Sequence, residues 1–223
     1  VVLLGGMRSR LVNLDCLRVV ACFGVVGIHT CMNYGVAGDS NMANVFWQAL
    51  FRGGLPVFVL LSGYLTIDLC KADGWMAFYG RRFLLLLAPF FVYAFLHYYV
   101  IHCSLRWGDL DFADFMRRIL TQGVWGHFWY VYEIAALYLL APGLSLLFRG
   151  LSQDGVRRVV LLLISVHLWN LIQRDVLSAL LQTKAVKDLL PFAGLDVWLV
   201  YFCLGALLPR VAEWRSGLGK SRN

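Results

Sequence analysis

The sequence predicts an all-α fold, a polytopic bundle of about six transmembrane helices. Hydrophobic residues make up 60% of the chain, charged residues make up 15%, and the mean hydropathy is +0.69, whereas a soluble domain of this length is far more polar. Apolar runs recur along the chain, each close to the length of about 20 residues that crosses a bilayer. The six runs occupy residues 14–33, 45–67, 83–103, 128–148, 156–173 and 194–212.

The distribution of Lys and Arg predicts that both termini are cytoplasmic. If all six runs cross and the N-terminus is inside, the inner segments hold twelve of the 20 basic residues, the outer loops hold six, and two lie within runs. This two-to-one excess follows the positive-inside rule and accounts for most of the net charge of +7. Nucleic-acid binding is disfavoured, because no basic patch is interleaved with stacking aromatic residues.

The short connections predict one membrane domain over residues 1–212, followed by a polar and basic cytoplasmic tail over residues 213–223. Because residues 1–6 are few and the first apolar run carries charges, we expect no cleavable signal peptide. Residues 109–120 have an acidic start and a basic end, which predicts a short amphipathic helix at the outer membrane surface. The six cysteines have neither CxxC nor metal-ligand spacing, so we expect no metal site.

Arg18 and His29, inside the first apolar run, indicate chemistry within the membrane. They are eleven positions apart, which at about 100° per residue returns both side chains to within about 20° of one helix face, about 16 Å apart along the axis. An ionisable group at that depth costs at least about 2.5–3.5 kcal/mol, so it is usually retained for a function. A purely structural interpretation is least favoured for this pair.

Ionisable residues from four runs converge on one depth. At a rise of about 1.5 Å per residue, His29 and Glu133 lie about 8 Å beneath the outer edge of an apolar core about 30 Å thick. His97 lies about 9 Å and Arg52 about 10 Å beneath the same edge. We therefore expect an outer catalytic layer. The residues that rim the opening above it are His127, His102 and Asp196.

The inner end of the bundle is expected to be cationic, with an apolar passage leading outward. Arg18 lies about 6 Å from the inner edge, and Ser62 falls close to that depth. Residues 53–56 include two glycines and a proline and weaken the second helix beside Arg52. Such interruptions are tolerated where the backbone lines a cavity.

Most of these residues also have an ordinary structural interpretation. Arg52 and Glu133 fit a buried ion pair between helices. Residues 62–63 fit a close helix contact through small side chains, and residues 128–130 fit an interfacial aromatic belt. Packing or interfacial roles fit three of the histidines, His97, His102 and His167.

Several motifs follow one another along most of the chain. The first run carries an Arg-x10-His pattern that ends in Gly27-Ile-His29. The others occupy residues 52–64, 79–82 with Pro89, 127–132 with Tyr138 and Pro142, and 201–205. In this order the motifs resemble membrane-bound acyltransferase family 3, especially its bacterial cell-surface O-acetyltransferases and the membrane domain of vancomycin-resistance serine racemases. Each motif alone is of moderate specificity, whereas the ordered set is specific.

The resemblance implies a multi-pass enzyme of the bacterial plasma membrane that moves an acyl group, most commonly acetyl, from cytoplasmic acyl-coenzyme A to a hydroxyl group. The acceptor would be an envelope glycan or a lipid-linked saccharide, and no cofactor would be bound permanently. Family members have about ten full-length spans. Because six fit here, we expect the N-terminal part of the fold or a shortened copy. Many relatives also carry an arginine at the position of Leu85, so the resemblance does not carry that contact with coenzyme A over to this chain.

On this basis His29, Arg52 and Glu133 are the predicted catalytic residues. His29 would act as the general base on the acceptor hydroxyl or carry the acyl group briefly. Arg52 would stabilise the oxyanion, and Glu133 would orient His29 or pair with Arg52.

The remaining predicted site residues bind the two substrates. The phosphates of acyl-coenzyme A would be held at the inner mouth by Arg18, Arg81 and Arg82, with Ser62 nearby. The thin pantetheine arm would thread the bundle towards His29. The predicted acceptor-side residues are His127, Trp129 and Tyr130.

Two other functions compete with this interpretation. Charges within the membrane also mark permeation routes, so an exporter of polysaccharide or of a small molecule is the first alternative. A truncated, non-catalytic remnant is the second, because 223 residues are few for closing the cavity. Self-association into a homo-oligomer, which would supply missing walls, stays open.

Overall fold

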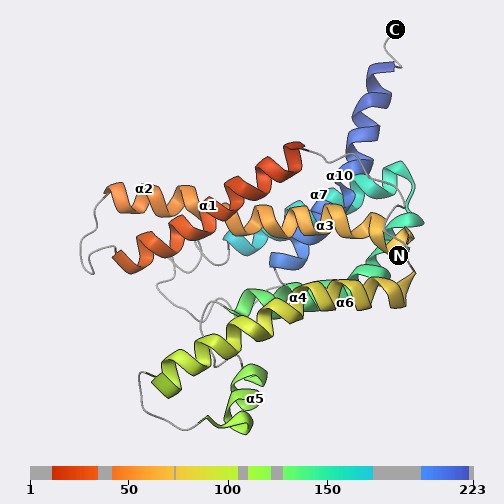
Figure 1. Cartoon of the computed structure of the whole chain (residues 1–223). Helices are drawn as coiled ribbons and strands as arrows, with labels where there is room; N and C mark the ends of the chain where they lie inside the picture. The colour runs from red at the N-terminus through yellow and green to blue at the C-terminus, as the bar shows by residue number, and fades with distance from the viewer. Residues whose placement is uncertain are drawn as a thin grey trace. The chain divides into compact units, whose positions relative to one another are not determined.

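The computed structural model describes residues 12–34, 42–72, 74–104, 110–121, 128–172 and 197–220, and within these ranges every regular element is a helix (Figure 1). The predicted all-α fold is confirmed. The helices are α1 (Val12–Tyr34), α2 (Met42–Phe51), α3 (Gly54–Ala72), α4 (Trp75–Tyr98), the π-helix η1 (Tyr99–Ser104), α5 (Phe112–Leu120), α6 (Trp129–Arg149), α7 (Gln153–Leu171) and α10 (Val197–Lys220).

Four stretches of the described chain are long and apolar enough to cross a membrane. They are Asn13–Cys31, Met42–Thr66, Trp75–Ile101 and Trp129–Arg149, and they coincide with the first four predicted spans. The last two predicted spans fall on α7 and α10. Helix α7 carries Asp154, Arg157 and Arg158 near its start, and the apolar part of α10, Val197–Ala212, is shorter than a full span. Helix α10 continues to Lys220, so the backbone of residues 213–220, in the predicted tail, is helical.

Large apolar side chains are exposed along the helices. On α4, for example, Leu84, Leu85 and Val92 have exposed fractions of 69%, 66% and 59%. In water so extensive an apolar surface would cause aggregation, whereas lipid tails solvate it. The exposed side chains therefore support the membrane bundle that the composition predicts.

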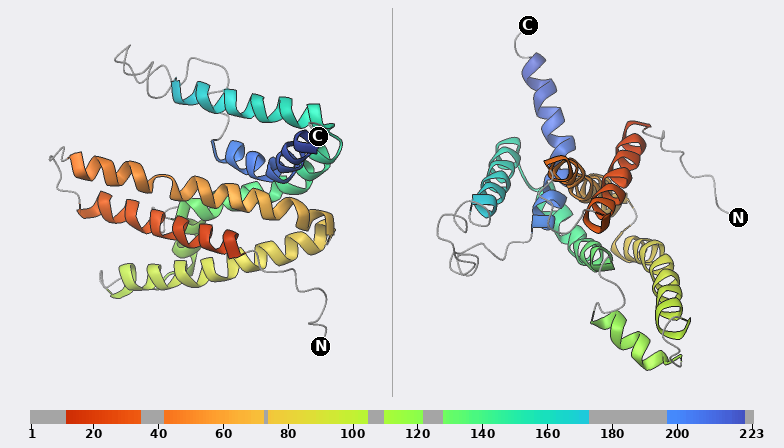
Figure 2. Two further views of the ribbon diagram at one scale, coloured as in Figure 1. Left: turned by 90° about the horizontal axis from the view of Figure 1, so that it is seen from above. Right: turned by 90° about the vertical axis from the view of Figure 1, so that its left-hand side faces the viewer.

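The chain forms two compact units. One combines the residues up to Leu65 with those from Gln153 onward, and the other spans Thr66–Ser152. Helices α1, α2, α7, α10 and most of α3 belong to the first unit, and α4, η1, α5 and α6 belong to the second. In the first unit α1 lies against α2, and α7 lies against α10; in the second, α4 lies against α6 (Figures 1 and 2).

Glycines bring α1 into backbone contact with the start of α3. A Cβ atom at Gly54 would lie 2.8 Å from the carbonyl oxygen of Ala21, and one at Gly24 would lie 3.0 Å from the Cα of Gly54. Neither position has room for a side chain. Small residues permit this close approach, and in lipid it provides the packing that holds helices together.

A second close crossing joins α3 to α10. A Cβ atom at Gly63 would overlap the carbonyl oxygen of Phe202, and a Cβ atom at Gly205 would overlap the carbonyl oxygen of Leu60. The two glycines therefore face opposite backbones at one crossing. Phe202 itself is fully buried. The sequence predicts that residues 62–63 could serve as a close helix contact, and for Gly63 the crossing with α10 is such a contact.

In the second unit, α5 closes a small apolar core against α4. The core contains Phe90, Ala94 and Tyr98 from α4 together with Phe115 and Ile119 from α5. Tyr132 of α6 donates a hydrogen bond from its hydroxyl to the carbonyl oxygen of Ile119, at 2.6 Å. Helix α5 is therefore fixed to both α4 and α6.

The amphipathic helix predicted for residues 109–120 is confirmed as α5. Asp111 caps its N-terminus, because the Asp111 carboxylate accepts a hydrogen bond from the backbone N–H of Ala113 at 2.8 Å. Asp114 accepts hydrogen bonds from Arg117 at 2.7 Å and from Arg118 at 2.6 Å. These bonds, from Arg117 first, lower the pKa of Asp114 to about 2.

The α3–α10 crossing gives the first prediction. Replacing Gly63 by Ala should destabilise the protein by about 1–3 kcal/mol, because the added methyl group forces two backbones apart. Gly143→Ala is the matched control, because no atom lies within 4 Å of a Cβ at Gly143, and alanine in a helix interior is neutral or stabilising. Denaturant unfolding in detergent micelles measures both. Equal stabilities of the two variants would contradict the crossing.

The second prediction concerns pH. Because the pKa of Asp114 is lowered from 3.8 to about 2, its ion pairs stabilise α5 above pH about 4 and lose that effect as the pH falls towards 2. Hydrogen exchange of residues 112–120, corrected for intrinsic rates, should show protection falling over this window. In Asp114→Asn the protection should be lower at neutral pH and flatter with pH. If Asp114→Asn showed the same dependence of protection on pH as the wild type, the Asp114 ion pairs would not be its cause.

Candidate active site

Helix α1 is continuous from Val12 to Tyr34 and carries both Arg18 and His29, as predicted. Arg18 is exposed, and its guanidinium donates a hydrogen bond to the carboxylate of Asp15, one helical turn earlier, at 2.7 Å. His29 is half-buried. At about 1.5 Å per residue the imidazole lies about 16 Å further along the helix. One rigid element therefore sets the spacing between a cation and a base.

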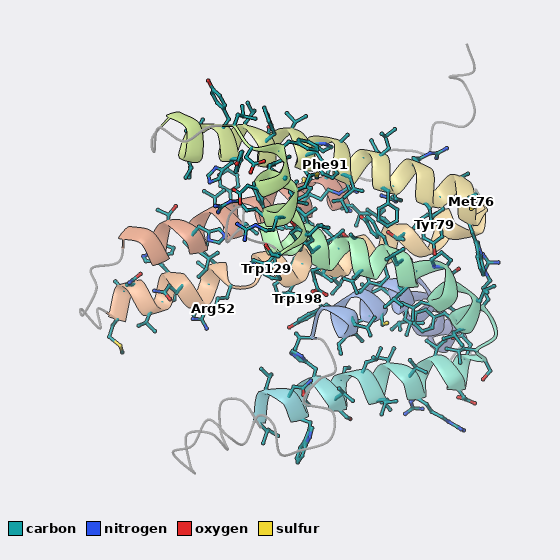
Figure 3. All side chains as sticks on the ribbon, turned by 90° about the horizontal axis from the view of Figure 1, so that it is seen from below. Arg52, Met76, Tyr79, Phe91, Trp129 and Trp198 are labelled. Carbon is teal, nitrogen blue, oxygen red and sulfur yellow. The ribbon has the colours of Figure 1, made fainter. Side chains whose placement is uncertain are left out.

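The predicted weakness in the second span is confirmed as a break between α2 and α3. Helix α2 ends at Phe51, Arg52 and Gly53 form a turn, and α3 begins at Gly54. The N–H of Arg52 still donates to the carbonyl oxygen of Gln48, at 3.1 Å, and the Arg52 side chain is exposed. Figure 3 labels Arg52 at this break.

The break lies against the part of α1 that leads to His29. A Cβ atom at Gly27 would lie 2.7 Å from the ring of Phe51, so this ring packs directly on the glycine. Gly27 is two residues before His29, and Phe51 immediately precedes Arg52. The structure therefore brings together the chain segments that carry these two predicted catalytic residues.

Glu133, the third predicted catalytic residue, lies on α6 in the other compact unit and is half-buried. Its neighbour Tyr132 packs on the core that α4 and α5 form. The proposed contact of Glu133 with His29 or Arg52 stays a prediction. Within unit Thr66–Ser152, the position of Glu133 is set by the packing of α6 on α4.

Arg81 and Arg82 lie close to the N-terminus of α4 and differ in their surroundings. Arg81 is exposed, whereas Arg82 is half-buried, and its Cζ atom lies 5.5 Å from the centroid of the Tyr138 ring on α6. Sequence reasoning missed Tyr138 as a partner of Arg82. The residue was visible within a motif, but the sequence does not show which faces of two apolar helices meet.

Ser62, the remaining predicted residue at the inner end, is half-buried on α3 beside Gly63. The structure explains Gly63 by its crossing with α10 and leaves the role of Ser62 as a prediction.

The predicted acceptor-side aromatics are the first two residues of α6. The ring centroids of Trp129 and Tyr130 are 6.1 Å apart with the planes nearly perpendicular, and the Trp129 side chain is exposed (Figure 3). This geometry fits both an acceptor platform and an interfacial belt. His127, Asp196 and the side chain of His102 lie outside the described residues.

Two other histidines make packing contacts. His97 lies against the edge of the Phe128 ring, with centroids 6.1 Å apart. His167 and Tyr201 join α7 to α10 by a hydrogen bond of 3.2 Å between Nε2 and the tyrosine hydroxyl. The packing interpretation accounts for both contacts.

A comparison with known families identifies the class of protein to which the chain belongs. A family model described as an acyltransferase domain, that of acyltransferase family 3, matches residues 11–221. The chain belongs to acyltransferase family 3. The protein is therefore a multi-pass membrane acyltransferase, as the ordered motifs predict. No curated protein and no solved structure matches the chain.

The contact between α1 and the break gives a prediction for this acyltransferase. Gly27→Ala should push Phe51 away and displace the Arg52 turn, which we expect to lower acyl transfer by about 10-fold or more, because catalytic rates fall steeply with displacements near 1 Å. Adding Phe51→Ala removes the Cγ, Cδ1 and Cδ2 atoms that meet the new methyl group and should restore part of the rate. A Gly27→Ala protein with full activity would show that this contact does not set the site.

Proposed function

We propose that the protein transfers an acetyl group from cytoplasmic acyl-coenzyme A to a hydroxyl of an envelope glycan or a similar acceptor. The observation that carries this proposal is the continuity of α1, which places an exposed arginine and a half-buried histidine about three turns apart on one face. Arg18 can bind the phosphates of acyl-coenzyme A near one end of α1, and His29 can accept a proton nearer the other end.

The chemistry of coenzyme A supports the donor assignment. Its phosphates carry several negative charges and stay in water, so they require cations at the aqueous end of the bundle. Arg18 already donates to Asp15 at 2.7 Å, but a guanidinium has five N–H donors, so donors are left for a phosphate. Arg81 and Arg82 supply further cations on α4. The mostly apolar pantetheine arm is compatible with the interior of the bundle.

The proposed reaction needs one base and one cation near the thioester. A neutral imidazole nitrogen of His29 takes the proton from the acceptor hydroxyl as its oxygen attacks the thioester carbonyl. The guanidinium of Arg52 stabilises the oxyanion of the tetrahedral intermediate. The C–S bond then breaks and the imidazolium of His29 gives its proton to the departing sulfur, so that coenzyme A leaves as the thiol and His29 is neutral again. In this proposal Glu133 either orients the imidazole of His29 or forms an ion pair with Arg52.

A test of His29 separates this reaction from export. His29→Ala should lower acetyl transfer at least about 100-fold, because general-base catalysis contributes about 10²–10⁴-fold, while binding of acetyl-coenzyme A persists. The measurement is transfer of radiolabelled acetyl by the purified protein in nanodiscs, and acetylation of the envelope in cells. His167→Gln is the matched control, because His167 packs against Tyr201 at a different helix pair.

Two results would overturn the proposal. If acetylation of the acceptor persists in His29→Ala while its appearance at the cell surface fails, the protein is an exporter. If the wild-type protein neither binds acetyl-coenzyme A nor hydrolyses it, the chain is a non-catalytic remnant.

A further inference from the structure

The contact between Arg82 and Tyr138 is an interaction between a cation and an aromatic face. The Cζ atom of Arg82 lies over the Tyr138 ring at 5.5 Å from its centroid, within the distance of about 6 Å at which the ring quadrupole attracts a cation. Tyr138 is 9% exposed, and Arg82 is half-buried. Partial removal from water strengthens such a contact.

The Tyr138 ring also packs against Phe78 of α4. The centroids of these rings are 6.4 Å apart and their planes are nearly perpendicular, at 77°, while Phe78 is only 1% exposed. Phe78 and Arg82 are four residues apart and so share one face of α4. Tyr138 from α6 therefore contacts both residues of this pair.

A hydrogen bond fixes the two helices at the same level. The hydroxyl of Tyr79 donates to the carbonyl oxygen of Leu139 at 2.9 Å. Figure 3 labels Tyr79 close to Met76, at the end of α4 that lies away from Phe91. The ring under Arg82 is thus part of a rigid contact between α4 and α6.

The electrostatics of Arg82 differ from those of Arg18. Arg18 pairs with the carboxylate of Asp15, which offsets its charge. The Tyr138 ring restrains the guanidinium of Arg82 by its quadrupole. Because the ring has no net charge, this contact does not compensate the positive charge of Arg82. A guanidinium has five N–H donors in a planar fork that matches phosphate oxygens, and attraction to a ring face consumes none of them.

We propose that Tyr138 is a positioning residue that holds the Arg82 guanidinium ready for a phosphate of the acyl donor. This inference rests on the proposed function and adds a residue to its donor site. Restraining a long, flexible side chain before binding lowers the entropy lost when the ligand binds. The benefit therefore appears in donor affinity and not in the chemical step.

The experiment measures coenzyme A binding and the kinetics of the purified full chain in nanodiscs. Tyr138→Leu should weaken coenzyme A binding and raise KM for acetyl-coenzyme A by about three- to tenfold, with kcat within about twofold. Tyr138→Phe keeps the ring and should stay close to wild type. Tyr93→Leu, an exposed tyrosine on α4 at 66% exposure, is the matched control for loss of a ring.

A double-mutant cycle with Arg82→Met tests whether the two residues act together. If Tyr138 acts through Arg82, adding Tyr138→Leu to Arg82→Met should produce little further loss. Additive losses, or a Tyr138→Leu protein that binds as wild type does, would overturn the proposal. Should Tyr138→Leu fail to fold, pentafluorophenylalanine at position 138 is compared with Tyr138→Phe, because fluorination reverses the ring quadrupole with little change in shape. Equal affinities of those two proteins would also overturn it.

The experiments distinguish failure of the proposed donor, acyl-coenzyme A, from failure of the proposed role of Tyr138. If the wild-type protein does not bind coenzyme A, the donor assignment and the role of Tyr138 both fall. If the wild type and Tyr138→Leu bind it equally well and Arg82→Met binds it weakly, only the positioning role falls.

Discussion

Backbone contact through glycine is the constraint on which the first compact unit depends. Lipid tails are as apolar as the side chains of these helices, so burial from water cannot drive the helices together. Close packing must do so instead, and Gly24 with Gly54 and Gly63 with Gly205 permit it at two crossings. The first crossing also places the break between α2 and α3 beside α1. The packing that stabilises the unit therefore also places Arg52 near the segment that carries His29.

Three of the described arginines, Arg18, Arg52 and Arg82, have different surroundings, and the difference has electrostatic consequences. Arg18 shares its charge with Asp15 at 2.7 Å, Arg82 rests on the uncharged ring of Tyr138, and Arg52 occupies a turn where a helix is interrupted. A carboxylate partner reduces the field that an incoming anion meets, whereas an aromatic partner does not. In the proposed donor site, Arg82 would thus contribute more long-range attraction than Arg18.

Much of the secondary structure could be predicted from the sequence, because length and local chemistry determine it. Apolar runs gave the helices, residues 53–56 gave the break, and Asp111 with Arg117 and Arg118 gave the amphipathic α5. The faces on which helices meet could not be predicted. A helix that is apolar all round carries no stripe to indicate its partner, so the contacts of Gly63 with Phe202 and of Arg82 with Tyr138 become visible only in three dimensions. The roles of Glu133 and Ser62 stay predictions.

The choice of histidine for the proposed base follows from the depth predicted for it in the membrane. A carboxylate in the same place would have to be kept charged to act as a base, and charge is costly in the apolar core. An imidazole is neutral while it waits and becomes charged only when it accepts the proton. At that moment the oxyanion forms beside it, so the new positive and negative charges appear together and compensate each other. A fixed cation such as Arg52 then needs to favour only the intermediate. Under this proposal, the helix interruption at Arg52 and the imidazole of His29 together allow the reaction in a medium of low dielectric constant.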